Sequence, residues 1–340
     1  MSASKVVGSS RRVFLAQASA VGAAAMLGVS RPANAEPPPE TKKIRLVKIP
    51  AICLAPEYVA EDLLRLEGFS EVEYVAVDTQ IVSDLLAENR ADVTVSSPPQ
   101  LLPDLDAGKQ LVALAGIHGG CYELFVSEQI RSMRDLKGKR VAVEKIGDGV
   151  EYFYLASMVA YVGMDPRKDV QWVAAGTFNG MVDLFIEGKA DATLAFPPQP
   201  QQLRAKKIGR VIVNTAQDRP WSEYYCCLIS ARSQFVKENP VATKRAVRAI
   251  LKATDICANE PERAARYIVA KGYEQSYDVA LEVVKSLSYS RWRTYNVEDS
   301  LRFFGVRLHE VGMIKSDPNK LIVQGTDWRF LNELKKELKA

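Results

Sequence analysis

The sequence predicts an α/β fold of two lobes, each built on a parallel-type sheet flanked by helices. Three observations lead to this prediction: the chain has 340 residues, strands and helices alternate along it, and one segment of that pattern occurs twice. At roughly 150 residues a domain, the length corresponds to about two domains. Alternation of strands with helices is typical of parallel sheets that are covered by helices on both faces.

Composition and charge exclude several classes of protein. The chain is 47% hydrophobic and 25% charged, which is ordinary for a globular protein and excludes a disordered or fibrous one. Its net charge is +4, and residues 1–35 carry four basic side chains and no acidic one. The rest of the chain is therefore balanced, and it gives no support for binding to nucleic acid or to a membrane surface. With two histidines and five cysteines, we expect neither a multi-histidine metal site nor a disulfide scaffold, and we predict no cofactor.

The first 35 residues predict a signal peptide of the twin-arginine type. The paired Arg11 and Arg12 stand before a weakly apolar stretch over 16–29, and Ala-Asn-Ala at 33–35 supplies the small residues of a cleavage site. The alternative is a general secretory signal with a chance arginine pair. Both predict a periplasmic protein that is soluble after cleavage near Ala35, because no later stretch approaches ~18 uninterrupted apolar residues. The proline-rich residues 36–42 predict a linker.

An internal repeat sets the predicted architecture. Residues 84–100 and 183–199 are identical at nine of 17 positions, and both end in Pro-Pro-Gln. The similarity extends upstream, where 72–77 parallels 170–175. Each copy is expected to form a strand, a helix and a short buried strand. A chance match would not reproduce this order twice, so we predict two related units.

The remaining elements complete these units. A strand over 43–49 and a helix over 56–67 precede the first copy, and a strand over 139–144 and a helix over 150–162 precede the second, which makes each unit βαβαβ. Further strands are expected at 210–214 and 224–229. Helices are expected from about 239 to 259, over 261–271 and over 328–338, and they most simply return to cover the first lobe.

These elements predict the following organisation: residues 43–124 form the first part of lobe 1, 125–218 form lobe 2, and 219–340 return to lobe 1 and add the C-terminal helices. Ligands of such sheets bind beyond the carboxyl ends of the strands. Two sheets whose strand ends face each other would enclose a cleft, which is a preferred place for a ligand.

Several phrases of the sequence resemble one family. They are the leader, Asp-Leu-Lys-Gly-Lys-Arg-Val-Ala-Val at 135–143, Tyr-Val-Gly-Met-Asp-Pro at 161–166 and Gly-Lys-Ala-Asp-Ala at 188–192. The chain is similar to periplasmic solute-binding proteins of ABC importers, in the nitrate, sulfonate and taurine group, which also resembles the thiamine-pyrimidine family. The resemblance implies a type II periplasmic-binding-protein fold that closes like a hinge around a small-molecule solute. It also implies a monomer that delivers its solute to an ABC permease in the inner membrane.

The loops at the strand ends supply the predicted ligand-binding residues. Loops at 50–53, 96–97, 147–150, 176–179 and 196–198 should face the cleft, with the crossing segments 118–122 and 221–225. The predicted ligand-binding residues are Ala51, Ile52, Cys53, Ser96, Ser97, His118, Cys121, Asp148, Gly149, Val150, Thr177, Phe178, Asn179, Phe196 and Tyr225. Several of them stand at helix starts, which either bind anions or hold ordinary capping side chains.

The charge of the solute stays open at this stage. Convergent helix starts suit a sulfonate, a nitrate or a carboxylate. Asp148 and Glu151 would oppose an anion there, and no arginine falls in the predicted loops to clamp one. Tyr152, Phe178, Phe196, Trp221 and Tyr225 would form an aromatic box for a ring or a cation, or else pack in the core. We expect a small organic or anionic solute, such as a sulfonate or an aromatic acid.

The cysteines and one histidine leave alternatives open. Cys53 and Cys121 either pair as a disulfide or stay as thiols, and His118 either binds the ligand or supports a turn. Cys226 and Cys227 are expected to be buried thiols on opposite faces of a strand. The basic and aromatic cluster over 291–293 is expected to be a solvated helix face or, less favoured, part of the cleft.

Three functions compete for this sequence. The favoured one is a receptor without enzymatic activity that delivers a solute to a permease. The second is an enzyme on the same fold, related to thiamine-pyrimidine synthesis, for which Lys145 and His118 are the only basic candidates near the cleft. The third is a sensor subunit that presents its bound solute to a signalling partner.

Overall fold

The computed structural model describes residues 36–77 and 82–339. The predicted signal peptide at residues 1–35 lies outside the described residues and stays a prediction. A search of the described helices finds none that is both long and apolar enough to cross a membrane.

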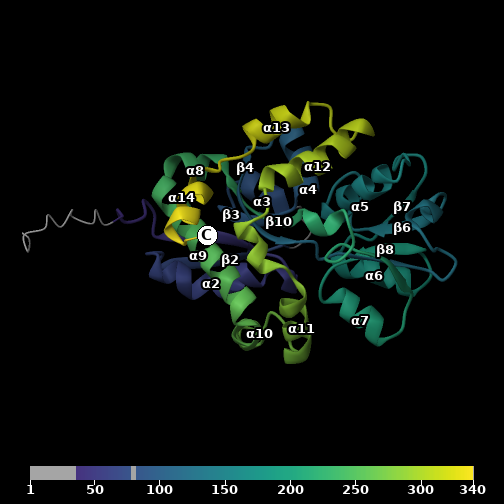
Figure 1. The fold of residues 1–340 in the computed structure, drawn as a ribbon, viewed down its shortest axis with the longest axis horizontal. Helices are drawn as coiled ribbons and strands as arrows, with labels where there is room; N and C mark the ends of the chain where they lie inside the picture. Colours follow the sequence, from purple (N-terminus) through teal and green to yellow (C-terminus); the bar gives the residue numbers. More distant parts are fainter. Residues whose placement is uncertain (1–35, 78–81, 340) are drawn as a thin grey trace, which may run out of the picture. The chain divides into compact units, whose positions relative to one another are not determined.

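The first sheet holds five strands in the order β2-β1-β3-β10-β4 (Figure 1). The strands are β1 (Lys43–Lys48), β2 (Glu71–Ala76), β3 (Val93–Ser96), β4 (Leu111–Gly119) and β10 (Tyr225–Arg232), and the helices between them are α2 (Ala55–Leu66), α3 (Val82–Ala87) and α4 (Pro98–Asp106). Strand β1 pairs in parallel with both β2 and β3. Strand β10 runs antiparallel to β3 and β4.

The second sheet repeats this arrangement in the order β7-β6-β8-β5-β9. Its strands are β5 (Glu123–Val126), β6 (Arg140–Val143), β7 (Gln171–Ala174), β8 (Ala192–Ala195) and β9 (Arg210–Asn214), and its helices are α5 (Val150–Tyr161), α6 (Phe178–Ile186) and α7 (Gln199–Ala205). Strand β6 pairs in parallel with β7 and β8, and β5 runs antiparallel to β8. The predicted fold class is confirmed, with one addition. Each sheet contains an antiparallel strand that the chain contributes as it crosses between the lobes.

Two crossing segments join the sheets. The chain leaves the first sheet after Gly119 and enters the second at Glu123, and it returns between Asn214 and Tyr225. The segments are bonded to each other, because the Tyr122 N–H donates to Thr215 Oγ1 (2.8 Å) and the Thr215 N–H donates to the Tyr122 carbonyl (2.8 Å). A Cβ atom on Gly120 would lie 2.0 Å from the Thr215 carbonyl oxygen, so this close approach requires glycine.

The C-terminal half is helical. It comprises α8 (Ser233–Glu238), α9 (Pro240–Asn259), α10 (Pro261–Ala270), α11 (Tyr277–Ser286), α12 (Val297–Glu310), α13 (Pro318–Gln324) and α14 (Arg329–Glu337), and short 3-10 turns occur at Ile52–Leu54, Met133–Leu136, Trp221–Glu223 and Tyr289–Arg293. Helix α9 packs on α2 of the first lobe, as predicted. Helix α12 contacts both α4 and α5, so it also reaches the second lobe. The sequence did not indicate this because α12 has no counterpart in the repeat.

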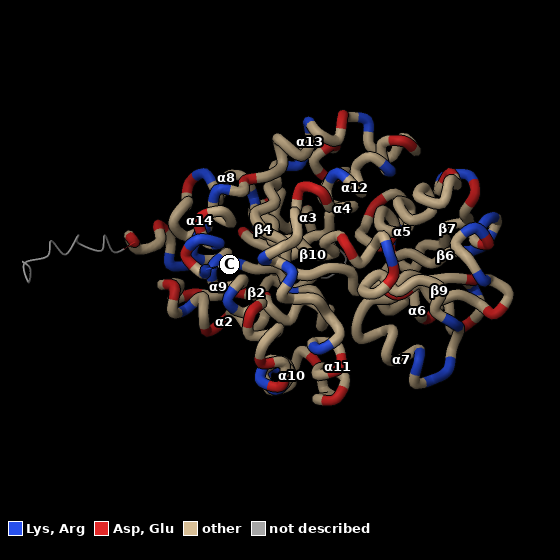
Figure 2. Tube along the Cα trace, viewed as in Figure 1, with Lys and Arg blue, Asp and Glu red and all other residues tan. Residues whose placement is uncertain are grey.

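Charged residues lie mainly on the outer helices and turns, while β4 and β10 are almost free of charge (Figure 2). Strand β4 is buried along its whole length, and it lies at the edge of the first sheet beneath the C-terminal helices. Helix α5 is equally apolar, with buried residues from Glu151 to Val159 around its whole circumference. A helix that is hydrophobic on all sides must be buried. It packs against α4 and α12, and Tyr152 in its first turn contacts Trp172 of β7, so its N-terminus is held at one fixed place.

Candidate functional site

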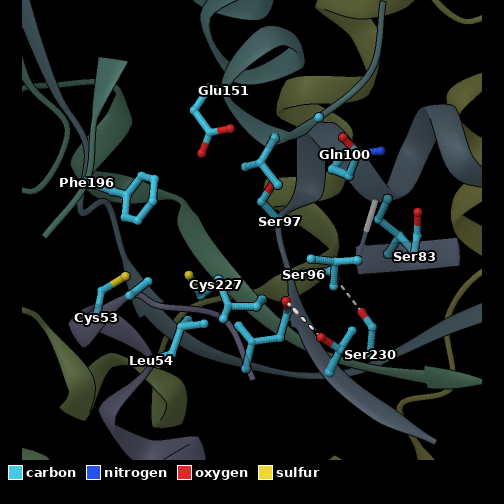
Figure 3. Close-up of a pocket in the computed structure, with 18 of the residues that line it drawn as sticks. Cys53, Leu54, Ser83, Ser96, Ser97, Gln100, Glu151, Phe196, Cys227 and Ser230 are labelled. Carbon is cyan, nitrogen blue, oxygen red and sulfur yellow. Dashed lines mark hydrogen bonds between the residues drawn. The ribbon is translucent and has the colours of Figure 1, made fainter. Parts of the chain in front are cut away.

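A pocket lies where the strand ends of the two sheets meet. It encloses about 900 Å³ of space, a volume that includes its open mouth. Figure 3 shows residues from both lobes around it, with Ser96, Ser97 and Gln100 facing Glu151 and Phe196. The lining residues used below are Ala51, Cys53, Ser96, Ser97, Gln100, Asp104, Cys121, Tyr122, Glu144, Gly149, Val150, Glu151, Phe178, Phe196, Cys227 and Ser230. Such a place, at strand ends and between lobes, is where α/β proteins bind ligands.

The first lobe contributes hydroxyl and amide groups. Ser97 is the N-cap residue of α4, but its side chain caps nothing, and its buried hydroxyl has no hydrogen-bond partner. Gln100, one turn later, donates from Nε2 to Asp104 (3.1 Å) and to Asp148 (3.3 Å), while its Oε1 is buried and unpartnered. Ser96 Oγ and Ser230 Oγ lie 2.6 Å apart. A buried polar atom without a partner costs about 1–3 kcal/mol, so Ser97 and Gln100 are suited to a ligand or a bound water.

The second lobe contributes two carboxyl groups. Burial, together with the charge of nearby Asp148, raises the pKa of Glu144 to about 7. Burial, together with the charge of Glu144, raises the pKa of Glu151 to about 8. The Tyr122 hydroxyl lies 3.4 Å from Glu151 Oε1, and Glu151 Oε2 has no partner. Near pH 7 Glu151 is therefore mostly protonated in the unliganded pocket, and its acid group is available to donate a hydrogen bond.

The backbone around these acids is set by glycine. Gly149 is the N-cap residue of α5 and has a φ of 89°, a conformation that glycine adopts at little cost. Its N–H is already taken by Asp148 Oδ1 at 2.8 Å. The wall of the pocket includes no Lys or Arg among the residues that the structure describes. An anion would therefore meet the carboxyl side chains of Glu144 and Glu151, and that of Asp104, whose charge is balanced by Lys109 (2.8 Å) outside the wall.

Three aromatic rings complete the wall. Phe178 and Phe196 meet edge to face with ring centroids 5.5 Å apart, and Tyr122 meets Phe196 at 6.0 Å. Tyr122 was not in the predicted aromatic box. The other three members of that box lie elsewhere. Tyr152 packs on Trp172, and Trp221 packs on Phe303.

Nine of the fifteen predicted ligand-binding residues line this pocket: Ala51, Cys53, Ser96, Ser97, Cys121, Gly149, Val150, Phe178 and Phe196. Six are not among its lining residues: Ile52, His118, Asp148, Thr177, Asn179 and Tyr225. Contact with a solute stays a prediction for the wall residues and for Ile52, His118, Asp148 and Tyr225, whereas the exposed Thr177 and Asn179 lie outside the wall and serve as controls. What the structure provides is their placement, which has a physical reason in each case.

Two of the six belong to a helix start on the surface. Thr177 is exposed and accepts a hydrogen bond at Oγ1 from the Gly180 N–H (3.0 Å), which makes it an ordinary N-cap of α6. Asn179 is also exposed. Of this loop, only Phe178 turns into the pocket.

Two more lie beside the pocket rather than in it. The Ile52 side chain is buried, while its N–H donates to the carbonyl of Pro197 in the other lobe at 3.3 Å. Asp148 lines an adjoining, more open pocket and pairs with Lys145 at 3.6 Å. Both residues therefore connect parts of the wall.

The last two lie in the interior of the first sheet. Tyr225 is buried, and its hydroxyl donates to the Arg291 carbonyl (3.0 Å). His118 is fully buried next to the last residue of β4, and its Nδ1 lies 2.5 Å from the Gly119 carbonyl oxygen. Trp292 is also fully buried, and its Nε1 donates to Asp255 (2.9 Å), while Arg291 is exposed. The 291–293 cluster is therefore solvated only in part, and it is not among the lining residues of the pocket.

Sequence reasoning missed several residues of the wall. Gln100 stands in the repeated Pro-Pro-Gln phrase, which was a usable signal. Glu144 ends the predicted strand over 139–144, and a carboxylate at a strand end was a second signal. Ser230 and Cys227 lie on the returning strand β10, where nothing in the sequence indicates that they face a pocket.

The five cysteines are free thiols in the structure. Cys53 and Cys121 are not joined, and Cys121 Sγ lies 3.2 Å from Cys226 Sγ. Cys226 and Cys227 are buried as predicted, but the prediction that they point to opposite faces is wrong. Pairing of β10 with β4 shifts in register on both sides of Cys227. This irregularity lets both sulfurs approach Cys121, because a bulge breaks the alternation of side chains.

A family model described as NMT1/THI5 like matches residues 58–264 of this chain. Among solved structures, the periplasmic nitrate-binding protein NrtA from Synechocystis PCC 6803 is similar with a TM-score of 0.76 and 16% identity, over 89% of this chain and 90% of that one. The alkanesulfonate-binding protein SsuA from Xanthomonas axonopodis pv. citri is similar with a TM-score of 0.69 and 13% identity, over 85% of this chain and 99% of that one. At these identities the likeness establishes the fold.

Curated relatives come from Brucella. A protein of Brucella abortus (strain 2308), named only as a candidate binding protein, is 27% identical over 158 residues, which is 46% of this chain and 48% of that protein. A protein of Brucella suis biovar 1 gives the same values. The chain spans about half the length of the curated relatives it matches.

Proposed function

The chain belongs to the NMT1/THI5-like family, and on that premise we propose that it is the solute-binding component of an ABC-type importer. The observation that carries the proposal is a single pocket whose wall comes from the strand-end loops of both lobes. A solute held there contacts both lobes at once. It therefore stabilises the closed arrangement by its greater affinity for that arrangement, which a permease can recognise.

The solute that fits the wall best is a small organic molecule with a ring or other apolar body and a hydrogen-bonding or basic nitrogen. Phe178, Phe196 and Tyr122 offer ring faces and edges. The Gln100 and Ser97 oxygens accept hydrogen bonds from N–H groups. As an acid, Glu151 donates a hydrogen bond to a neutral acceptor of the solute. As a carboxylate, it pairs with a cationic nitrogen of the solute.

A second candidate is an anionic solute, such as a sulfonate, nitrate, taurine or an aromatic acid. Two of the similar structures are named for nitrate and alkanesulfonate binding, and this favours an anion. The acidic wall without a lysine or arginine among its described residues opposes it. The protonated Glu151 and the unpartnered Ser97 hydroxyl are groups of the wall that would donate hydrogen bonds to an anion.

Binding rather than catalysis is proposed for the pocket. Lys145, one of the two basic candidates for catalysis, has a side chain that is 59% exposed and paired with Asp148, and it is not part of the wall. An enzyme related to thiamine-pyrimidine synthesis and a solute-presenting sensor subunit are the alternatives. Turnover of a bound solute would establish the former, and a signalling partner instead of a permease would establish the latter.

We further propose that residues 1–35 direct twin-arginine export and are cleaved near Ala35, that 36–42 form a linker, and that the mature protein is a periplasmic monomer. The lobes are assigned as 43–124 with 219–340, and 125–218. Replacing Arg11 and Arg12 by lysine should retain the precursor inside the cell. Mass analysis should show that the exported chain begins at residue 36, and sedimentation should give the mass of a single chain.

The function is tested by calorimetric titration of the mature chain with nitrate, sulfonates, aromatic acids, pyrimidines and amines. A solute at 100 times its Kd should also add about 2.7 kcal/mol to the free energy of unfolding. Phe178→Ala should weaken binding at least 10-fold, whereas the matched control Asn179→Ala, an exposed neighbour, should bind as the wild type does. Equal loss in both variants would contradict the placement of the site.

The pH dependence of the affinity identifies the class of solute. A cationic solute needs the Glu151 carboxylate, so its affinity should rise with pH through about 8. A solute that accepts a hydrogen bond from the acid should show the opposite trend. If no compound from the panel binds to a well-folded protein that carries no co-purified molecule, the receptor proposal fails.

A further inference from the structure

A cluster of thiols and one imidazole lies at the inner end of the pocket. One imidazole nitrogen of His118 and the sulfurs of Cys53 and Cys121 all lie within 4.8 Å of one another. The sulfurs of Cys121, Cys226 and Cys227 form a second such group that shares Cys121. All five residues are buried. The cluster combines three segments that are far apart in the sequence: the turn after β1, the end of β4 with the crossing segment, and β10.

The hydrogen bonds of His118 leave one of its nitrogens available. Nδ1 lies 2.5 Å from the carbonyl oxygen of Gly119. Because a carbonyl only accepts, Nδ1 carries the proton, and the lone pair of the neutral ring is on Nε2. Nε2 is buried and has no hydrogen-bond partner. This arrangement, in which a backbone carbonyl fixes the tautomer and the other nitrogen is free, is typical of histidines that bind metals.

Tyr289 holds the two sides of the cluster together. Its hydroxyl donates to the Cys53 carbonyl (2.9 Å), and its ring meets His118 edge-on with centroids 5.4 Å apart. Ser288 beside it lies 3.3 Å from the Gly119 N–H, which donates to its hydroxyl. The segment that carries these two residues thus supports both the cysteine turn and the histidine strand. Metal sites commonly have such supporting contacts.

The charges and donor atoms suit a thiophilic metal ion. Two thiolates and a neutral imidazole around a divalent cation give a neutral unit, so the ion removes the cost of burying separate charges. Sulfur and imidazole donors select zinc and copper(I) over magnesium or calcium. In a tetrahedral zinc site, the ligand atoms stand about 3.5–3.8 Å apart. The side chains need to move by only about 1 Å to reach that spacing from the present one.

We propose that Cys53, His118 and Cys121 form a binding site for a thiophilic metal ion, of which Zn²⁺ is the type, with its fourth position toward the pocket. Cys53, Cys121 and Cys227 line the pocket, so the ion has a path of entry. Figure 3 shows Cys53 and Cys227 close together on the side of the pocket near Phe196. The fourth ligand is Cys227, a water or a molecule in the pocket. Three protein ligands with one open position are the arrangement of zinc sites that act on a bound molecule.

The site is tested by titrating the reduced, untagged mature chain with Co²⁺ under anaerobic conditions. We expect one ion per chain and the absorption of a tetrahedral thiolate–cobalt centre, which Zn²⁺ then displaces. Cys53→Ser and Cys121→Ser should abolish the thiolate absorption or halve it, and His118→Gln should weaken binding at least 10-fold. Cys257→Ser is the matched control, because Cys257 is a buried free cysteine on α9 that belongs to neither group. It should bind as the wild type does.

Two further measurements separate loss of the metal site from misfolding and from oxidation of the thiols. Zn²⁺ should raise the melting temperature of the wild type and of Cys257→Ser, but not that of a folded Cys53→Ser variant. A thiol count before and after reduction tells whether Cys121 and Cys226 are joined in the oxidised protein, which should then bind metal only after reduction. Absence of metal binding by the fully reduced, folded wild type overturns the proposal. Equal affinity in wild type and in Cys53→Ser also overturns it. Neither result bears on solute binding, because the titrations contain no solute.

Discussion

Gln100 and Gln199 occupy the same place in the two copies of the repeat, yet only one of them faces the pocket with a free group. In the second lobe, Gln199 Oε1 accepts from the Phe196 N–H (3.3 Å), and Nε2 donates to the Phe178 carbonyl (2.9 Å). In the first lobe, Gln100 Oε1 has no partner. The same residue in the same phrase therefore has a structural role in the second lobe, where it joins two backbone segments. In the first lobe it is a candidate contact for a solute.

The residue three positions earlier explains the difference. Ser97 in the first lobe corresponds to Phe196 in the second, at the same offset of 99 residues. The backbone of Phe196 turns toward Gln199 and its ring enters the pocket, so the second lobe supplies an apolar wall with its polar groups satisfied. Ser97 supplies a hydroxyl instead, and neither it nor Gln100 Oε1 finds a partner. The repeat preserves the scaffold, whereas the pocket depends on where the copies differ.

The scaffold itself is preserved in detail. Arg45 at the start of the first sheet binds Asp92 through Nε (3.0 Å) and Nη2 (2.6 Å). Arg140 binds Asp191 in the second sheet through Nε (3.1 Å) and Nη2 (2.8 Å). Each pair joins the first strand of its unit to the residue just before the third. Two-point arginine–carboxylate contacts of this kind fix geometry well.

The largest expected effect is a difference in stability between variants of these two arginine–aspartate pairs. The Asp92 side chain is 5% exposed and is also 3.5 Å from Arg232, whereas Asp191 is 25% exposed. Asp92→Ala removes the carboxylate partner of two guanidinium groups in a partly buried place, and of its described contacts there Arg45 keeps those with Asn89. It should lower the free energy of unfolding by about 3 kcal/mol. Asp191→Ala should cost distinctly less because water replaces the lost contact. Urea unfolding of both variants measures the difference, and equal losses would show that burial does not separate the two lobes.

The next effect is the pH dependence of stability that arises from the acidic residues which the second lobe contributes to the pocket wall. Burial raises the pKa of Glu151 to about 8, so the folded, unliganded protein binds a proton that the unfolded chain releases near pH 4.5. The stabilisation is complete below pH 4.5 and is lost as pH rises toward 8 and above, by about 1 kcal/mol per pH unit. Glu151→Gln should remove the Glu151 part of this slope between pH 5 and 8, while Glu144, whose pKa burial raises to about 7, keeps a slope of its own up to about pH 7. Thermal unfolding across that range is the measurement. The same slope in wild type and variant would show that another group is responsible.

A smaller effect tests the two glutamines directly. Gln199→Ala leaves the Phe196 N–H and the Phe178 carbonyl without their side-chain partner. It should lower the free energy of unfolding by about 2 kcal/mol. Gln100→Ala removes a group with one orphan oxygen, so it should cost less stability but weaken solute binding. Denaturant unfolding and calorimetric titration of both variants give the two quantities. The comparison fails if Gln199→Ala weakens binding without a loss of stability.

The smallest effect separates two helix starts. Thr177→Ala removes an N-cap hydrogen bond of 3.0 Å and should cost about 1 kcal/mol. Ser97→Ala removes a hydroxyl with no partner, so it should leave stability within about 0.5 kcal/mol of the wild type. Affinity for the solute should change only in Ser97→Ala. A loss of about 1 kcal/mol in Ser97→Ala would indicate that its hydroxyl does cap α4.

Much of the fold follows from local sequence. The repeat predicts the strand–helix–strand units because Val93–Ser96 and Ala192–Ala195 are short apolar strands between helices in both copies. The predicted helix from about 239 to 259 is α9 (Pro240–Asn259), and the predicted strand over 210–214 is β9. These elements depend on periodicity and on proline placement, which are properties of neighbouring residues.

Only the tertiary structure shows which residues form the candidate site. Which residues of a loop face a pocket depends on how the two sheets approach, so Phe178 points in while Asn179, one residue later, is exposed. Ser230 and Cys227 enter the wall through the antiparallel return of β10, and no local pattern records that pairing. The gathering of Cys53, His118 and Cys121 likewise comes from segments separated by up to 68 positions. Local sequence determined the elements because their energetics are local, and only long-range packing decided which side chains meet.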